Sequence, residues 1–275
     1  MASDKVSSTL QYPSFGDTTK NTFKLFFVNM KYFLWLGLFF TVAFGAINLL
    51  SVSIMTSSFN TTNYAGFALV VLMPLILILV NLIPGIIYNL ATVELTKQIV
   101  AKKEVSGKQA LSFAFSKFGK GLEILWYSFI HLLPGLVPFA GVYIAAFFVG
   151  LEAYFILGLI AFVAGIYLIG KMIQIYFAYH AFVFHKLEGQ AALDWSKKLI
   201  SGNFWSFFWY AFGFSLIAGL LIMLPFSYLL GAVSSTLGAD VVFVIDFIGQ
   251  WLSSGLLMVF FTLIYIDISV KLTSK

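Results

Sequence analysis

Long apolar segments alternate with short polar segments along most of this chain. Six of the apolar segments reach the length of about 20 residues that a helix needs to cross the hydrocarbon core of a bilayer. These segments are Tyr32–Thr56, Gly66–Lys97, Leu122–Gly150, Ala153–Phe184, Phe204–Leu230 and Val241–Val270. The pattern therefore predicts an all-α integral membrane protein, a single polytopic domain with six transmembrane helices.

The composition supports this interpretation. Hydrophobic residues make up 61% of the chain and charged residues 10%, whereas a soluble domain carries about 25% charged residues. A chain with so few charges cannot cover its own surface with polar groups. We therefore expect lipid to surround much of the protein.

The basic residues indicate the orientation in the membrane. All 16 of them are lysines, and 15 belong to the segments on one side of the predicted membrane, namely Met1–Lys31, Lys97–Gly121, His185–Asn203 and the tail from Lys271. The connections predicted on the opposite side hold none; they are Ser57–Ala65, the turn at Glu152 and Gly231–Asp240. Because short loops rich in lysine stay in the cytoplasm, we expect both termini on the cytoplasmic side of a cell membrane.

Three segments on the lysine-rich side carry apolar residues at helical spacing. After Lys108 the apolar positions are Ala110, Leu111, Ala114, Phe115, Phe118 and Leu122. The same plan recurs 82 residues later with Ala192, Trp195, Leu199 and Ile200, and a fainter copy near the start of the chain has Phe23, Phe26, Phe27 and Met30. We expect amphipathic helices that lie in the membrane interface and contact anionic lipid headgroups through Lys108, Lys120, Lys197 and Lys198.

Each of these amphipathic segments runs directly into a predicted transmembrane helix. The chain can therefore be read as three repeats of one unit, an interfacial helix followed by a transmembrane hairpin, at about residues 15–97, 105–184 and 188–270. Repeats of this kind bury their inner faces only by packing against one another, so we expect a pseudo-threefold arrangement. The alternative is that basic amphipathic loops occur in any multi-pass protein and carry no repeat.

The end of the second predicted repeat carries a recognisable pattern. Gly165-Ile166-Tyr167-Leu168 begins an apolar run that ends in Phe182-Val183-Phe184, and the polar positions that follow are Glu188-Gly189, Ala192-Leu193, Ser196 and Gly202-Asn203-Phe204-Trp205. This pattern resembles the membrane domain of membrane-anchored bacterial glycerophosphodiester phosphodiesterases and of related free-standing six-helix membrane proteins.

The resemblance implies a six-helix fold in a bacterial cytoplasmic membrane. The chain departs from the family pattern at Ala164, where proline is common, and at Lys171, a charge inside the apolar run. No length remains for the soluble phosphodiesterase domain. No catalytic residue is therefore carried over, and we expect a protein that is not an enzyme.

A few polar residues lie within the predicted helices, where ionisable groups are costly. Lys171 either snorkels to the cytoplasmic headgroups or joins an inward-facing polar layer with Asn89, which lies 82 residues earlier. His131 precedes the Pro134-Gly135 pair and is either part of a proton relay or bonded to a carbonyl freed by the proline.

Two acidic residues lie near the cytoplasmic ends of predicted helices. Glu94 belongs to the second helix and Asp267 to the sixth. We expect them at the interface, where Lys97 and Lys271 lie close to them in the sequence. The alternative is that one of them pairs with Lys171 inside the bundle.

The sequence holds no pattern of nucleophile and base, no phosphate-binding loop and no metal-ligand spacing, and it has no cysteine. We therefore expect no cofactor and no metal. Because no arginine is present, we expect no nucleic-acid partner. The leading hypothesis is a non-enzymatic membrane module that binds lipids or a membrane or cytoplasmic protein partner. The alternative is a transporter or lipid translocator, which the proline-interrupted helices favour; these prolines are Pro74, Pro84, Pro134, Pro138 and Pro225.

Overall fold

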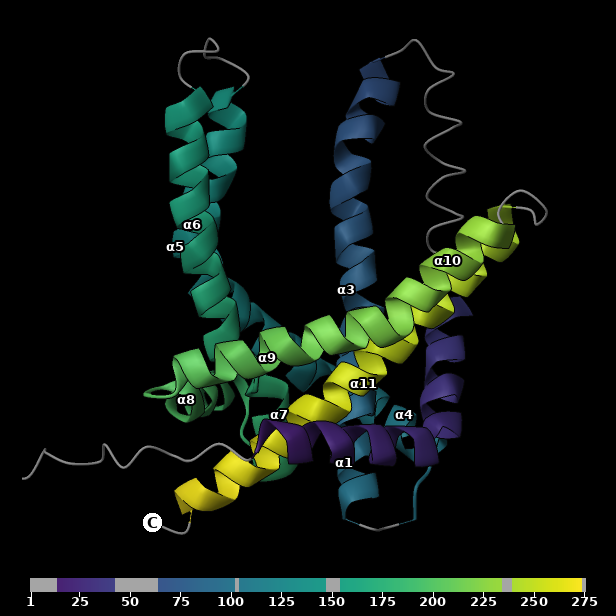
Figure 1. Ribbon diagram of the computed structural model, residues 1–275. Coiled ribbons are helices and arrows are strands. Elements are labelled where there is room, and N and C mark those ends of the chain that lie inside the picture. Colours follow the sequence, from purple (N-terminus) through teal and green to yellow (C-terminus); the bar gives the residue numbers. More distant parts are fainter. Residues whose placement is uncertain (1–13, 43–63, 102–103, 147–153, 234–238, 274–275) are drawn as a thin grey trace, which may run out of the picture. The chain divides into compact units, whose positions relative to one another are not determined.

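The computed structural model describes residues 14–42, 64–101, 104–146, 154–233 and 239–273. These residues form helices and no strand, so the predicted all-α class is confirmed (Figure 1). Four helical stretches within them are long and apolar enough to cross a membrane, namely Phe118–Val142, Phe155–His185, Phe204–Ala232 and Ile248–Val270. These stretches coincide with the last four predicted spans. Most of their ends agree with the predicted ends to within a few residues.

The first two predicted spans are not among these four stretches. Helix α1 (Phe15–Val28) and the helical segment Met30–Val42 meet at a bend of 73°, and they make a fifth span only if the bent pair is counted as one. The rest of the first predicted span, residues 43–56, lies outside the described residues. Helix α3 (Tyr64–Val100) covers the second predicted span without a break, but its side chains are described only from residue 82 onward. Six spans are therefore not confirmed.

The described part of the chain divides into two compact units. One unit comprises residues 119–211 together with residues from 265 onward, and the other comprises residues 14–118 and 212–264. The long helices α9 (Phe204–Ala218) and α11 (Ala239–Thr273) contribute residues to both units.

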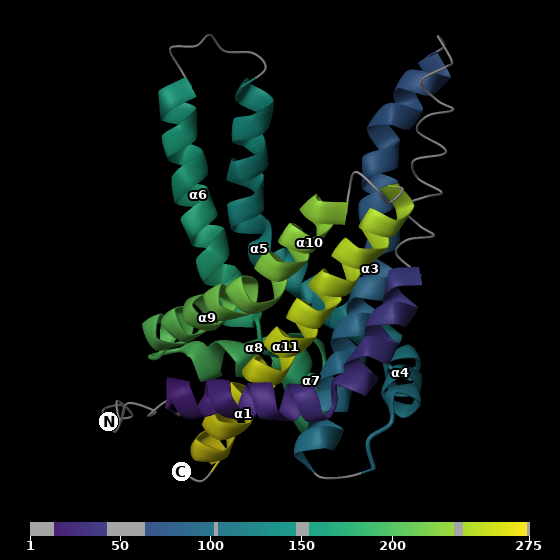
Figure 2. The ribbon, with the colours of Figure 1, turned by 45° about the vertical axis from the view of Figure 1, so that its right-hand side comes forward.

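In the unit built around residues 119–211, a long hairpin stands on shorter helices. Helices α5 (Phe118–Ala146) and α6 (Tyr154–Ile175) run side by side, as Figure 2 also shows. Gly135 makes their close approach possible, because a Cβ atom there would lie 2.7 Å from Leu168 and 2.8 Å from Tyr167. Helices α7 (Ala178–His185) and α8 (Gly189–Ile200) follow α6, and α8 packs against both.

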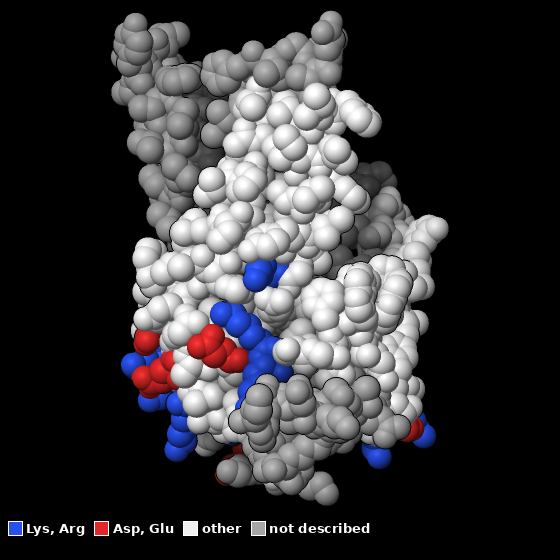
Figure 3. Space-filling view, turned by 90° about the vertical axis from the view of Figure 1, so that its left-hand side faces the viewer, with Lys and Arg blue, Asp and Glu red and all other residues white. Residues whose placement is uncertain are grey.

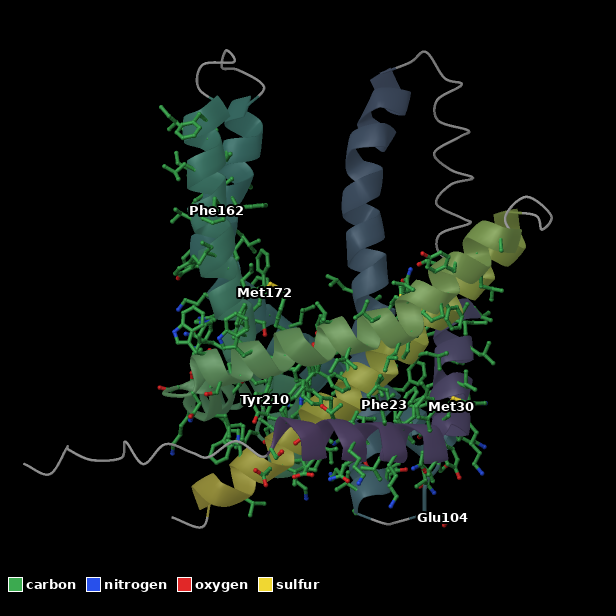
Figure 4. The ribbon with its side chains drawn as sticks, in the orientation of Figure 1. Phe23, Met30, Glu104, Phe162, Met172 and Tyr210 are labelled. Atoms are coloured by element: carbon green, nitrogen blue, oxygen red, sulfur yellow. The ribbon has the colours of Figure 1, made fainter. Side chains whose placement is uncertain are left out.

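The hairpin of α5 and α6 exposes apolar side chains along most of its length. Only 6% of the apolar window in Phe155–His185 is buried within the protein. Phe162 and Met172, labelled in Figure 4, are both more than half exposed on α6. Because a helix that is apolar all round needs either a protein core or lipid around it, this exposure fits a hairpin that stands in the bilayer.

In the other unit, α3 and α11 supply most of the buried side chains. Helix α4 (Gly107–Ser116) packs beside α3. Leu90 and Leu95 of α3 and Leu256 of α11 are fully buried. The rings of Phe214 on α9 and Phe260 on α11 stack in parallel, with centroids 3.8 Å apart and planes within 3°.

A π-helical turn, η2 (Gly219–Met223), separates α9 from α10 (Leu224–Val233) within the fifth predicted span. It ends two residues before Pro225. A proline has no amide hydrogen to donate and crowds the preceding turn, so a local change of winding at this point has a direct cause. Pro134 and Pro138, in contrast, lie inside α5 without ending it.

Candidate functional site

Three short amphipathic helices, α1, α4 and α8, each precede an apolar helical segment. On α8 the buried residues include Ala192, Leu193, Ser196, Leu199 and Ile200, and on α4 they include Ala110, Leu111 and Ala114. These faces pack on the protein itself, because α8 lies on α6 and α7, and α4 lies on α3. The polar faces and their lysines are therefore presented outward by helices that the protein holds in place.

Ser196 fixes α8 at the break between α6 and α7. Its hydroxyl donates a hydrogen bond of 2.7 Å to the carbonyl oxygen of Gln174 and accepts one of 3.0 Å from the backbone amide of Phe177. Ser196 is fully buried. The break leaves both backbone groups without a partner inside a helix, so this one hydroxyl satisfies them and anchors α8.

The start of α8 is fixed against α5. Gly189 has a φ of 47°, and a Cβ atom at this position would collide with the carboxylate of Glu123 and lie 3.0 Å from Cε2 of Tyr127. Beside it, the ammonium of Lys120 lies 2.6 Å from the carboxylate of Glu188 and 3.4 Å from that of Glu123. Gly189 is therefore needed both for the backbone conformation and for the close approach.

Helix α4 is held in a similar way. The side-chain oxygen of Gln98 on α3 accepts a hydrogen bond of 3.1 Å from the backbone amide of Ser106. The Ser106 hydroxyl caps α4 by accepting one of 3.3 Å from the amide of Gln109. The next residue, Gly107, lies against the ring of Trp35, since a Cβ atom there would be 3.0 Å from the indole.

Helix α1 packs on α11. A ring carbon of Phe26 lies 3.3 Å from the place that a Cβ atom of Gly255 would occupy. The rings of Phe15 and Phe260 meet edge to face, with centroids 6.1 Å apart. On α1, Thr22 is fully buried and Phe26 is 1% exposed.

The four lysines predicted to contact headgroups fall into two pairs. Lys120 is bound to Glu188 and Glu123, and Lys197 lies 3.3 Å from the carboxylate of Asp194. Lys108 and Lys198 are exposed, and neither has a carboxylate partner among the described residues. The ammonium of Lys198 lies 5.7 Å from the Trp195 ring centroid. Two of the four therefore carry a charge that no described carboxylate pairs.

The acidic candidates and Asn89 lie on α3 and α11. Glu94 binds its neighbours on α3, with 3.5 Å to the ammonium of Lys97 and 3.4 Å to the amide of Gln98. Asp267 is half-buried on α11, and Asn89 is half-buried on α3. Because Asn89 and Lys171 belong to different units, the predicted polar layer between them stays a prediction.

Lys171 and His131 belong to the same unit and lie near each other. The ammonium of Lys171 lies 5.3 Å from the Tyr167 ring centroid, and within the described part of its unit it forms no ion pair. The charges of Lys171, Lys197 and Asp194 act on the imidazole of His131.

The surroundings of His131 include a polar side chain of α6. Its Nε2 atom is buried and has no hydrogen-bond partner among the residues that the structure describes. Gln174 lies beside the ring. Sequence reasoning missed Gln174, although its spacing from Tyr167 and Lys171 puts all three on one face of a helix and could have indicated it.

An apolar groove of about 410 Å³ runs between α5 and α6 in the same unit. Its lining residues are Pro134, Gly135, Pro138, Leu159, Ile160, Val163, Ala164 and Tyr167. On the face drawn in Figure 3, the charged side chains gather in the lower half, and the described surface above them carries no charge. The groove is a feature that the sequence analysis did not predict, because it arises from two prolines and a glycine in α5 facing α6.

Metal binding has no candidate within the described ranges, where no three acidic or histidine side chains come together. Comparison of the chain with family models, with curated proteins and with solved structures gives no match. The resemblance to the phosphodiesterase membrane domains therefore stays a prediction that rests on the residues between 165 and 205 alone.

Proposed function

We propose that this protein is a non-enzymatic membrane module that binds anionic lipids at its cytoplasmic surface. One observation carries the proposal: α4 and α8 bury their apolar faces in the protein and present lysines, Lys108 and Lys198, whose charges no described carboxylate neutralises. Lysines held near a membrane surface attract anionic headgroups, at about 1 kcal/mol for each residue.

The proposal includes six spans in three repeats, at residues 15–97, 105–184 and 188–270. It is supported by a relation that recurs between neighbouring repeats. Helix α4 packs on α3, the last helix of the repeat before it, and α8 packs likewise on α6 and α7. Helix α1, in the first repeat, contacts α11, the last helix of the third repeat, through Phe26 and Phe15. Repeats that each pack an amphipathic helix on another repeat bury their inner faces in this way.

We place the protein in a bacterial cytoplasmic membrane with both termini in the cytoplasm. The uneven distribution of lysines supports the orientation, and the resemblance to the phosphodiesterase membrane domains supports the bacterial location. The same exposed lysines would also suit a membrane or cytoplasmic protein partner with an acidic surface. We propose no nucleic-acid partner and no cofactor.

A transporter or lipid translocator is the second candidate. The observation that favours it is the π-helical turn Gly219–Met223 ahead of Pro225, because such turns inside transmembrane helices often mark functional positions. Most of the residues that line the α5–α6 groove are apolar, and such a lining favours a lipid over a hydrophilic solute as the transported molecule. Movement of a fluorescent phospholipid between the leaflets of reconstituted vesicles would distinguish translocation from binding alone.

Native mass spectrometry of the detergent-purified protein, with equal amounts of phosphatidylglycerol or phosphatidylcholine added, tests the proposal. We expect more phosphatidylglycerol to be retained, and we expect the double variant Lys108→Gln/Lys198→Gln to lose this preference about fivefold or more, following the contribution of each lysine. The matched control is Lys97→Gln/Lys120→Gln, which removes two lysines that carboxylates already pair.

Equal retention of the two lipids by the unaltered protein would contradict the proposal. An equal loss in the two double variants would also contradict it, because net charge alone would then explain the preference. Co-purification of one acidic polypeptide that the first double variant alone releases would assign the surface to a protein partner instead.

A further inference from the structure

We propose that the groove between α5 and α6 holds an acyl chain of one anionic phospholipid, whose phosphate lies at Lys171 and His131. This inference rests on the proposed lipid-binding function and gives it a specific site. The volume of the groove, about 410 Å³, lies within the range of about 300–1,000 Å³ that is typical of ligand sites.

The groove has an apolar floor and an apolar rim. Gly135 forms part of the lining where α5 approaches Leu168 and Tyr167 most closely. Val163 and Ile160 line the groove and are 60% and 44% exposed, so it opens on the apolar side of the hairpin. In a membrane this side faces hydrocarbon, which makes an acyl chain the occupant that fits.

On each helix a polar residue lies just beyond the lining of the groove, and the two residues lie at the same end of the groove. On α6, Lys171 lies one turn beyond Tyr167, a lining residue whose ring its ammonium faces at 5.3 Å. On α5, His131 lies one turn before Pro134, another lining residue. Because α5 and α6 run side by side in opposite directions, the two residues lie at the same end of the groove.

At the polar end, Nε2 of His131 is buried without a hydrogen-bond partner among the described residues, although Gln174 lies beside the ring. Lys171 forms no ion pair with a described carboxylate. Two further charges act on this imidazole, those of Lys197 and Asp194, and they are paired with each other at 3.3 Å. Lys171 is thus a cation at this end that no described carboxylate neutralises, and an anionic phosphate would pair it and bond Nε2.

An anionic phospholipid combines the two chemistries that the groove offers, an acyl chain and a phosphate joined at one end. A free phosphate ion would use only the polar end and would be indifferent to the shape of the groove. An apolar additive would use only the groove and would be indifferent to Lys171. The two ends can therefore be tested separately.

The test measures retention of the most tightly held phosphatidylglycerol by native mass spectrometry, with phosphatidylcholine and excess inorganic phosphate as separate competitors. We expect Lys171→Gln and Val163→Trp each to lower the affinity at least tenfold, and Lys171→Arg to preserve it. The matched control is Val137→Trp, which alters an exposed residue of α5 outside the groove lining. This control should leave the one tight site unchanged.

A thermal unfolding curve of each variant in detergent verifies folding, and an affinity is compared only between variants that unfold within a few degrees of the unaltered protein. Unaltered affinity in Lys171→Gln or in Val163→Trp would overturn this inference. Displacement of the lipid by inorganic phosphate in equal measure with and without Val163→Trp would overturn it as well. If phosphatidylglycerol shows a preference that responds only to the Lys108 and Lys198 changes, the broader proposal stands without this site. If the unaltered protein shows no preference at all, both fail.

Discussion

The hydroxyl of Ser196 on α8 donates a 2.7 Å hydrogen bond to the carbonyl oxygen of Gln174 near the end of α6. It also accepts one of 3.0 Å from the amide of Phe177, just before α7. The two groups face each other across the break between these helices, and 22 residues of chain separate Ser196 from Gln174. The amphipathic helix is thereby tied to the membrane hairpin by hydrogen bonds as well as by its apolar face.

Replacing Ser196→Ala removes this link while keeping the size of the side chain nearly unchanged. The carbonyl of Gln174 and the amide of Phe177 are then left unsatisfied in a buried place, and we expect the free energy of unfolding to fall by about 1–3 kcal/mol. Thermal unfolding in detergent measures the change. Ser112→Ala on the exposed face of α4 is the control, with an expected effect within about 0.5 kcal/mol. A melting temperature of Ser196→Ala equal to that of the control would contradict the role of this hydroxyl.

The conformation of Gly189 gives a second prediction. Gly189→Ala introduces a Cβ atom where φ is 47° and where the Glu123 carboxylate already lies, so we expect a loss of about 1–3 kcal/mol in stability. Gly158→Ala on α6 meets no atom within 4 Å and should be neutral or slightly stabilising. The same unfolding experiment checks both, and a harmless Gly189→Ala would show that α8 does not start against α5 in this way.

The stacked rings of Phe214 and Phe260 provide a buried reference for a test of which aromatic side chains face lipid. Phe260 is fully buried and Phe162 is 65% exposed on α6. We expect Phe260→Ala to cost about 3–5 kcal/mol, as for other buried aromatic residues, and Phe162→Ala to cost far less because lipid replaces the lost contact. Urea is unsuited to this comparison in detergent, so thermal unfolding of the two variants side by side is the measurement. Similar losses in both would mean that α6 is covered by protein and not by lipid.

The sequence predicts the apolar helices well and the amphipathic ones less completely. The stripe that begins at Ala110 is predicted to continue to Leu122, but α4 ends at Ser116, and Lys117 leaves the helical conformation with φ −109° and ψ 9°. Phe115 and Leu122 are both exposed on the protein. The spacing of hydrophobic residues does not indicate this one-residue break, which changes the direction of the helix that follows.

The stripe on α8 shows a different limit. Leu193 and Ser196 are both fully buried, although the predicted apolar face includes neither of them. A serine counts as polar in any such pattern, and its burial depends on backbone groups that only the fold brings near. The packing of α8 against the break after α6 was therefore beyond the reach of local sequence.

The ion pairs of the candidate lysines also differ in whether the local sequence predicts them. The pair of Lys197 with Asp194 is three residues apart on one helix and follows from spacing. The pair of Lys120 with Glu188 joins residues that are 68 positions apart, and no local pattern indicates it. Exposed ion pairs of this kind add little stability. This pair nevertheless neutralises Lys120, so Lys120 is not one of the lysines that remain available to bind a lipid headgroup.

Site-directed labelling measures the position of the lysine-bearing helices relative to the membrane most directly. The chain has no cysteine, so the single-cysteine variants Lys108→Cys, Lys198→Cys and Glu152→Cys can each be treated with a membrane-impermeant maleimide in bacterial cells. We predict that Glu152→Cys reacts in intact cells, whereas Lys108→Cys and Lys198→Cys react only after the cells are broken. Labelling of Lys108→Cys or Lys198→Cys in intact cells would contradict the account.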